Sequence, residues 1–98
     1  MKLSIIIPTF NNLAYLKLCI KSIKKNSKFK HDIKLHINDG SDGTLEFAKK
    51  NNFFFTYSKD NIGLCSAINK VTSTVNNKYI LYAHDDMYFC PEWDINLI

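Results

Sequence analysis

The chain has 98 residues, of which 46% are hydrophobic and 22% charged, so it suits one modest folded domain and is unlike a disordered chain. Its net charge is +4, and all 13 basic residues are lysines. Proteins that read nucleic-acid sequence rely on arginine for bidentate contacts, so we expect no nucleic-acid partner.

The first elements are a strand and a helix. A short apolar run at residues 3–7 predicts a buried strand that ends at Pro8. Asn11 or Asn12 can then cap a helix. The apolar stripe of this helix recurs at helical spacing, at Leu16, Cys19, Ile20 and Ile23. We interpret the lysine cluster on and after it as a solvated face rather than a phosphate track: Lys21, Lys24, Lys25, Lys28 and Lys30.

The middle of the chain predicts a second strand at residues 33–38, followed by a turn-rich segment at 39–44. Ser41 or Asp42 can cap a short helix that ends near Lys50. Aromatic and β-branched residues at 53–57 predict a third strand.

A third helix is predicted to start with Asn61 as its cap and to end at residues 76–77. Its buried stripe would be Leu64, Ile68, Val71 and Val75. Residues 79–83 predict a fourth strand. The order βαβαβαβ predicts an α/β fold with a mostly parallel sheet between helices, as a single domain spanning residues 1–98.

Polar or turn-forming residues follow every predicted strand. Because ligands of open parallel sheets bind beyond the carboxyl ends of the strands, we expect these residues to share one rim. The candidates are Pro8, Thr9 and Asn11 after the first strand, Asp39 after the second, Asn61 and Gly63 after the third, and His84, Asp85 and Asp86 after the fourth.

Asp85 and Asp86 carry the sharpest chemical signal. Adjacent carboxylates at the end of a buried strand repel each other and need a cation or strong donors to stay ionised. A hard divalent ion with oxygen ligands would serve, and such ions often bridge carboxylates to substrate phosphates. A helix cap or a solvated turn is the alternative. The glycine-rich phosphate loops of other nucleotide folds are absent, so bound phosphates would depend on a metal.

Other rim residues admit two interpretations. Asp39 either belongs to a tight turn or accepts hydrogen bonds from a base. Asn61 and Gly63 are a cap and a packing residue, or ligand contacts. His84 is a metal ligand, a phosphate partner or a structural residue, whereas we interpret His31 and His36 as structural. A last group, Tyr88 and Trp93, is a sugar platform or belongs to the core of the C-terminal half expected beyond this chain.

Three cysteines, Cys19, Cys65 and Cys90, lie in or beside apolar runs without a C-x-x-C pair. They predict reduced, buried thiols and hence a cytoplasmic protein, with peripheral membrane association as the alternative. Pro8 interrupts the first apolar run too early for a signal peptide. No run approaches the roughly 20 residues that span a bilayer.

Together these motifs resemble the family 2 glycosyltransferases. Ser4-Ile-Ile-Ile-Pro-Thr-Phe-Asn11 is similar to the family's opening strand and nucleotide loop, and Asn38-Asp-Gly-Ser-Asp-Gly-Thr44 to its second-strand motif. Asn61-Ile-Gly63, with Ala67 and Asn69, resembles the third-helix motif. Tyr79-Ile-Leu-Tyr-Ala-His-Asp-Asp86 stands where the family carries its D-x-D motif.

The resemblance implies a GT-A fold, a Rossmann-like three-layer α/β/α sandwich. It implies a nucleotide-diphosphate sugar donor, most often a UDP-sugar, and a hexosyltransferase that inverts the transferred sugar. Pro8, Thr9, Asn11, Asp39, Asn61, Gly63 and Asp85 would bind the donor. Asp86, with Asp85, would hold Mn²⁺ or Mg²⁺, which stabilises the leaving nucleotide. The acceptor, whether glycan, lipid or protein, is not identified.

The sequence departs from the family pattern at three points. His84 stands where the first Asp of D-x-D is expected, and Asp85 is the candidate to replace its contact with the ribose. Ile68 replaces an Arg common in the third-helix motif. The catalytic base and the acceptor-binding part are expected beyond Ile98.

The interrupted C-terminal end leads to further expectations. We expect a truncated domain with an exposed edge, and either a homodimer or a disordered tail after about Cys90. The expected exposed apolar residues are Phe89, Trp93, Ile95 and Leu97. A non-catalytic nucleotide-sugar-binding module, or a fragment without transferase activity, is the alternative function. A flavodoxin-like or response-regulator-like protein is less favoured, because the first strand lacks an acidic pair after it.

Overall fold

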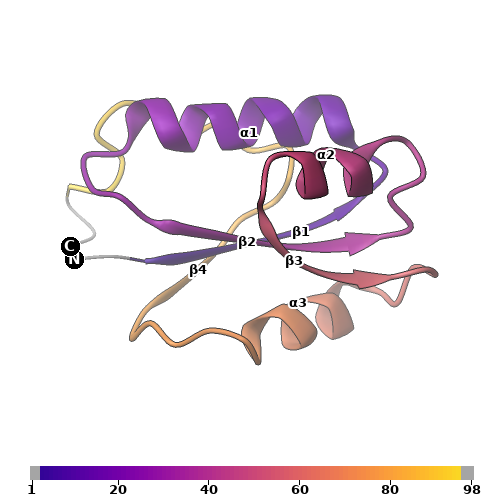
Figure 1. Ribbon diagram of the computed structural model, residues 1–98. Coiled ribbons are helices and arrows are strands. Elements are labelled where there is room, and N and C mark those ends of the chain that lie inside the picture. Colours follow the sequence, from indigo (N-terminus) through magenta and orange to yellow (C-terminus); the bar gives the residue numbers. More distant parts are fainter. Residues whose placement is uncertain (1–2, 96–98) are drawn as a thin grey trace.

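Four parallel strands form one sheet in the order β3-β2-β1-β4, in a computed structural model that describes residues 3–95. The strands are β1 Ser4–Phe10, β2 Asp32–Asn38, β3 Phe54–Ser58 and β4 Ile80–Tyr82. The helices are α1 Leu13–Asn26, α2 Thr44–Lys50 and α3 Leu64–Thr72. Figure 1 shows α1 and α2 above the sheet and α3 below it. The predicted element order and the three-layer α/β/α sandwich are confirmed.

Strand β1 continues through Pro8, so the prediction that Pro8 ends it was wrong. Ser4 donates a backbone hydrogen bond to Tyr79, and Ile6 accepts one from Ala83, so alternate residues of β1 face the β4 side. Pro8 is the next residue to face that side, and it has no N–H to donate. Pairing with β4 therefore stops there, while pairing of β1 with β2 continues to Phe10 and Asn38.

Helix α1 covers the upper face of the sheet as its stripe predicted. Its apolar stripe, Leu16, Cys19, Ile20 and Ile23, is buried. It packs on the strand residues that point up from the sheet, Ile5, Ile7, Leu35 and Ile37, all of which are fully buried. This cluster is the main core, and burial of a side chain of this size contributes about 1.5–3 kcal/mol.

One carboxylate, Asp42, holds the start of two helices. Its Oδ2 accepts a hydrogen bond from the Leu13 N–H at 3.1 Å, and its Oδ1 accepts one from the Thr44 N–H at 3.0 Å. Asn12 occupies the cap position of α1 without a side-chain cap bond, and Gly43 precedes α2. Burial alone would raise the pKa of Asp42, but the hydrogen bonds outweigh it and lower the pKa. Asp42 therefore caps α1, which is distant in sequence, as well as α2, which follows it directly.

Helix α3 differs from its prediction in its cap, its end and its buried face. Gly63 rather than Asn61 occupies the cap position, and the helix ends at Thr72, before Val75. Its fully buried residues are Ala67 and Val71, whereas Leu64 is 51% exposed. The helix packs mainly on β1 and β2.

The segment after Cys90 is ordered through residue 95, so the predicted disordered tail was wrong for residues 91–95. Phe89 is buried, and its ring packs edge-on against Trp93 with centroids 4.7 Å apart. The Trp93 indole N–H donates to Ser27 Oγ at 2.9 Å, and the Glu92 N–H donates to the Asn26 carbonyl. The segment satisfies groups that the end of α1 leaves unpaired.

The expected exposure of the apolar residues in this segment is confirmed for one residue and wrong for two. Ile95 is 40% exposed as expected, while the expected exposure of Phe89 and Trp93 was wrong because both pack beside α1. Leu97 lies outside the described residues. Trp93 therefore belongs to the core of this domain, and Tyr88 is exposed. The homodimer stays a prediction.

Cys19 is buried as expected, but Cys65 and Cys90 are exposed, so the prediction of buried thiols was wrong for them. Cys65 lies on the outer side of α3, and Cys90 follows the buried Phe89. Among residues 3–95, no helix combines the length and the apolar character that crossing a bilayer requires.

Candidate functional site

An open cavity of about 360 Å³ lies at the carboxyl edge of the sheet. Residues at the ends of the four strands or shortly after them line it: Pro8, Thr9, Phe10, Asn12, Asn38, Asn61, Gly63, Leu64, His84 and Asp85. The expected convergence of strand ends on one rim is therefore confirmed. Of the predicted site residues, Pro8, Thr9, Asn61, Gly63 and Asp85 line the cavity, whereas Asn11, Asp39 and Asp86 do not.

A hydrogen bond joins the ends of β1 and β4 at the floor of this cavity. Thr9 Oγ1 donates to Asp85 Oδ2 at 2.8 Å, across 76 positions of sequence. Thr9 is 2% exposed, so its hydroxyl is held in place by packing as well as by this bond. Within residues 3–95, no protein group donates a hydrogen bond to the other carboxylate oxygen, Oδ1. Asp85 therefore presents a fixed carboxylate to the cavity.

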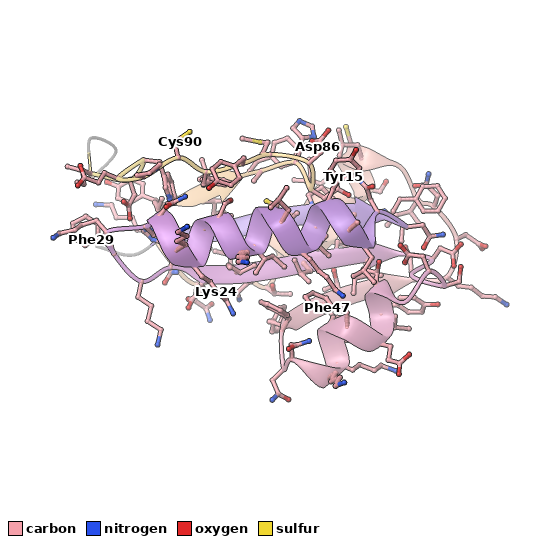
Figure 2. The ribbon with its side chains drawn as sticks, turned by 90° about the horizontal axis from the view of Figure 1, so that it is seen from above. Tyr15, Lys24, Phe29, Phe47, Asp86 and Cys90 are labelled. Carbon is pink, nitrogen blue, oxygen red and sulfur yellow. The ribbon has the colours of Figure 1, made fainter. Side chains whose placement is uncertain are left out.

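Asp86 follows Asp85 and is exposed. Figure 2 places Asp86 at the end of the molecule where Tyr15 marks the start of α1, and far from Phe29. Burial, together with the charges of Asp85 and Asp86, raises the pKa of the Cys19 thiol to about 11. The charges of both carboxylates therefore reach the Cys19 thiol under α1.

His84 is oriented by its neighbours at the cavity wall. The Tyr82 hydroxyl and His84 Nδ1 are 3.2 Å apart, and the two rings meet edge to face with centroids 4.9 Å apart. The His84 backbone N–H donates to Met87 Sδ. Burial raises the pKa of Tyr82, and the charge of Asp85 adds to the effect. With Nδ1 engaged by Tyr82, Nε2 is the ring nitrogen available to a ligand.

Asn11 and Asp39 pair with each other beside the cavity. Asn11 Nδ2 donates to Asp39 Oδ2 at 3.0 Å, and the Ser41 N–H donates to Asp39 Oδ1 at 3.2 Å. Hydrogen bonds from Ser41 and Asn11 lower the pKa of Asp39. Both residues adopt left-handed backbone angles, with φ of 46° and 63°, which Asn and Asp tolerate better than most residues. This exposed carboxylate stays ionised at the end of β2.

Asn38 is a site residue that the sequence analysis did not single out. Its Oδ1 accepts hydrogen bonds from Ser58 Oγ at 2.9 Å and from the Ile62 N–H at 3.2 Å. These bonds tie the loop before α3 to the end of β2. The Asn61 side chain in turn accepts a bond from the Gly63 N–H at 3.0 Å. The position of Asn38, directly before Asp39-Gly40, is the signal that could have identified it.

The two histidines expected to be structural have partners within the fold. His36 is fully buried, and its ring nitrogens contact Thr56 Oγ1 and Ser58 Oγ. Burial lowers the pKa of His36. His31 Nδ1 accepts a bond from the Leu3 N–H, and its Nε2 lies 2.7 Å from Asp94 Oδ2. Neither histidine lines the cavity.

The charges around the cavity restrict how it can bind an anion. No lysine lines it, and its lining carboxylate, Asp85, would repel a phosphate. Within residues 3–95, no group of three or more His, Cys, Asp or Glu side chains gathers to hold a metal. The residues present fit a divalent ion that takes one or two carboxylates and completes its shell with substrate oxygens and water. They do not fit a metal held by protein ligands only.

Comparison with known proteins identifies a family and similar folds. The model of the family described as Glycosyl transferase family 2 matches residues 4–98. No curated protein matches the chain.

Among solved structures, S. aureus TarS residues 1–349 in complex with UDP is 22% identical, with a TM-score of 0.85, over 99% of this chain and 31% of that chain. The same TarS segment in complex with UDP-GlcNAc is 21% identical, with a TM-score of 0.77, over 99% and 29%. A third structure, of S. aureus TarS, is 20% identical, with a TM-score of 0.78, over 99% and 19%. The chain spans less than a third of each TarS chain, and the likeness establishes the fold.

Proposed function

The chain belongs to glycosyl transferase family 2, and from that membership we propose that its cavity binds the nucleotide diphosphate of a sugar donor, preferably a UDP-sugar. The sugar would be a hexose, transferred with inversion to a glycan, lipid or protein acceptor.

The observation that carries this proposal is the Thr9–Asp85 hydrogen bond at the floor of the cavity. It brings the end of the first strand, where the nucleotide-loop motif lies, against the acidic motif after the fourth strand. Asn61 and Gly63 close the cavity from the loop before α3. One ligand could therefore contact all three motifs at once, which suits a nucleotide with its phosphates and sugar.

The two sides of the cavity favour different parts of the donor. Phe10 is 50% exposed at the end of β1 and offers a ring face to a base. Asn11 and the ionised Asp39 lie alongside and can bind base N–H groups or ribose hydroxyls. Asn12 and Asn38 add amide groups to the lining. Polar contacts beside one exposed ring are typical of sites that orient a planar ligand.

We propose that Asp86 and Asp85 hold Mn²⁺ or Mg²⁺ together with the donor. The argument is electrostatic: a diphosphate that enters a cavity with carboxylates and no lysine needs a cation between the charges. The bound ion would supply Lewis-acid stabilisation to the leaving nucleotide. In this arrangement Thr9 orients the Asp85 carboxylate, and partners of this kind tune metal affinity.

The preference for UDP rests on fold likeness. The similar TarS structures were solved with UDP and with UDP-GlcNAc, and their TM-scores over nearly all of this chain are 0.85 and 0.77. Uracil offers one N–H donor between two carbonyl acceptors, which Asp39 and the amide of Asn11 can match. We therefore propose UDP over a purine nucleotide.

A titration by calorimetry tests donor binding. UDP is added to the chain with and without Mn²⁺, and then to Asp86→Asn and to Glu92→Gln. Glu92 is exposed and lies beside Asn26 at the end of α1, so its variant makes the same charge change away from the cavity. We expect UDP to bind in the presence of Mn²⁺, and only Asp86→Asn to lose this binding. Equal binding by both variants would contradict the metal assignment.

A second assay separates the enzyme from the binding module. Release of UDP from UDP-sugars, measured with and without candidate acceptors, would establish transfer or hydrolysis. Donor binding without any turnover would favour a non-catalytic nucleotide-sugar-binding module, because the fold and the family membership would hold while the chemistry would not.

A further inference from the structure

One segment carries all of the excess positive charge of the chain. Residues 11–31 hold six lysines and no Asp or Glu, while the other residues hold seven lysines and all nine acidic side chains. The six are Lys17, Lys21, Lys24, Lys25, Lys28 and Lys30, and all are exposed. We name them, with Phe29, the basic surface.

The basic surface lies along α1 and at the edge of the sheet opposite the cavity. Helix α1 runs back from the carboxyl ends of the strands, so its last turn and the loop after it lie at their amino ends (Figure 1). A hollow of about 490 Å³ opens there. Its lining is basic and apolar without a carboxylate: Ile23, Lys24, Ser27, Lys28, Phe29, Lys30, His31 and Ile33.

The lysines of this surface are available to a partner. None of the six lies within ion-pair distance of a carboxylate among residues 3–95, where the one close pair is His31 with Asp94. Lys17 and Lys24 lie over the rings of Phe47 and Phe53. The helix dipole favours the two lysines of the last turn, Lys24 and Lys25, but does not account for the others.

Phe29 stands between Lys28 and Lys30 in the loop after α1. Its side chain is 37% exposed, and Figure 2 places it at the end of the molecule away from Asp86. The two oxygens of the buried Asp94 accept the N–H groups of Lys28 and Phe29, at 2.8 Å and 2.9 Å. His31 contacts the same carboxylate. The loop is therefore fixed by buried hydrogen bonds, and the ring is presented in a set position.

From this arrangement we infer that the basic surface docks the protein on a membrane that contains anionic lipids. Lysines within a Debye length of such a surface attract it, and an aromatic ring among them inserts at the headgroup level. The lysine-covered face of α1 also exposes Leu18, at 51%, which adds apolar contact. The combination of charge with an exposed ring favours a membrane over nucleic acid, because insertion at the headgroup level uses both features and the surface has no arginine for bidentate contacts with bases or phosphates.

Docking in this way leaves the donor cavity free. Docking through Lys24, Lys28, Phe29 and Lys30, at the amino ends of the strands, leaves the cavity at the carboxyl ends facing the aqueous phase. Membrane binding and donor binding are therefore independent, and a variant of the basic surface should bind UDP with Mn²⁺ as the unaltered chain does.

Co-sedimentation with vesicles tests the inference. The unaltered chain is mixed with vesicles of phosphatidylcholine that contain phosphatidylserine, and with vesicles of phosphatidylcholine alone. We expect binding to the anionic vesicles only, and weaker binding as salt is raised. The triple variant Lys24→Gln, Lys28→Gln, Lys30→Gln should lose about fivefold in affinity for each lysine, or about a hundredfold in all.

A matched control keeps the total charge change the same. The triple variant Lys49→Gln, Lys50→Gln, Lys59→Gln removes three exposed lysines outside the basic surface and should bind nearly as well as the unaltered chain. Phe29→Ala should weaken vesicle binding while circular dichroism shows an unchanged fold. Phe29→Trp should keep binding, and the fluorescence of the new indole should shift to the blue with anionic vesicles.

Three results would overturn the inference. They are failure of the unaltered chain to bind anionic vesicles, equal loss of binding by both triple variants, and binding to duplex DNA or RNA, lost in the first triple variant, without binding to vesicles. The last result would assign the surface to nucleic acid instead.

Discussion

Thr9 Oγ1 lies 2.8 Å from Asp85 Oδ2, so the last polar side chain of β1 holds the first carboxylate after β4. The strands β1 and β4 are neighbours in the sheet, and β4 ends where Pro8 removes the next donor of β1. The chain that follows β4 is then free to turn toward Thr9. The missing N–H of Pro8 ends the pairing of β1 with β4, and the hydroxyl of Thr9 then binds Asp85. Together these two residues fix the position of Asp85.

The first prediction concerns this hydrogen bond. Thr9→Val removes the donor at nearly constant volume, and we expect the unfolding free energy to fall by about 1 kcal/mol. Affinity for UDP with Mn²⁺ should fall about tenfold or more, because residues that orient a metal-binding carboxylate affect metal affinity on that scale. Thr9→Ser keeps the donor and should bind as the unaltered chain does. Calorimetry of the three proteins checks this, and equal affinity for Thr9→Val would remove Asp85 from the proposed site.

The second prediction concerns Asp94 and acid. Burial would raise the pKa of this carboxyl, but hydrogen bonds from Lys28, Phe29 and His31 outweigh it and lower the pKa to about 2. The folded pKa lies below the unfolded value of about 3.9, so folding favours the ionised form. The resulting stabilisation is complete above about pH 4 and is lost as pH falls through about 2.

Urea denaturation of Asp94→Asn at several pH values tests this. The variant should lose about 1–3 kcal/mol near neutral pH, since it leaves buried groups poorly paired. The difference between the two proteins should shrink as pH falls from about 4 toward 2. Asp60→Asn, at an exposed position, is the control. A difference that does not change with pH would contradict the assigned role of the Asp94 charge.

The third prediction compares two glycines with left-handed backbone angles. At Gly40, with φ of 78°, an added Cβ would lie 2.8 Å from Ile37 Cγ2 and 3.0 Å from Leu45 Cβ. At Gly63, with φ of 85°, it would meet nothing within 4 Å. Gly63→Ala should cost about 1–3 kcal/mol from backbone strain. Gly40→Ala should cost about 1–3 kcal/mol more, because it also overpacks the core. Thermal unfolding measures both, and equal losses would show that the core relaxes around the methyl group.

The fourth prediction concerns thiol reactivity. Burial and the charges of Asp85 and Asp86 raise the pKa of Cys19 to about 11, which suppresses its thiolate near neutral pH. Cys65 and Cys90 are exposed. Mass spectrometry of the native protein treated with iodoacetamide should find Cys65 and Cys90 alkylated first, and Cys19 only after denaturation. Early alkylation of Cys19 would mean that α1 separates from the sheet more readily than its packing indicates.

Much of the fold could be predicted from local patterns, because apolar periodicity reports which face of an element is buried. The stripe of α1, the four strands and their parallel order were predicted in this way. The order of elements also predicted that Thr9, Asn61, Gly63 and Asp85 would share a rim, since parallel strands end at a common edge. The family resemblance from the same motifs is confirmed by the family match.

Some site residues could not be predicted because their partners are distant in sequence. Asn38 takes its role from Ser58 and Ile62, which come near it only when β2 and β3 pair. The role of Asp39 in binding the donor stays a prediction, and its hydrogen bond from Asn11, like the position of both residues beside the cavity, could not be read from the sequence. No periodicity reports such side-chain pairs.

The sequence by itself determined the order of strands and helices, the apolar faces of α1 and the polar ends of the strands, because backbone preferences and burial periods act over a few residues. Only the tertiary structure decided that β1 runs through Pro8, that Asp42 caps two helices, and that Phe89 and Trp93 pack beside α1. Each of these depends on which surface lies opposite a residue. The group that satisfies an unpaired donor, a strand edge or a helix end is one that lies near it in space. That group can be far away along the chain.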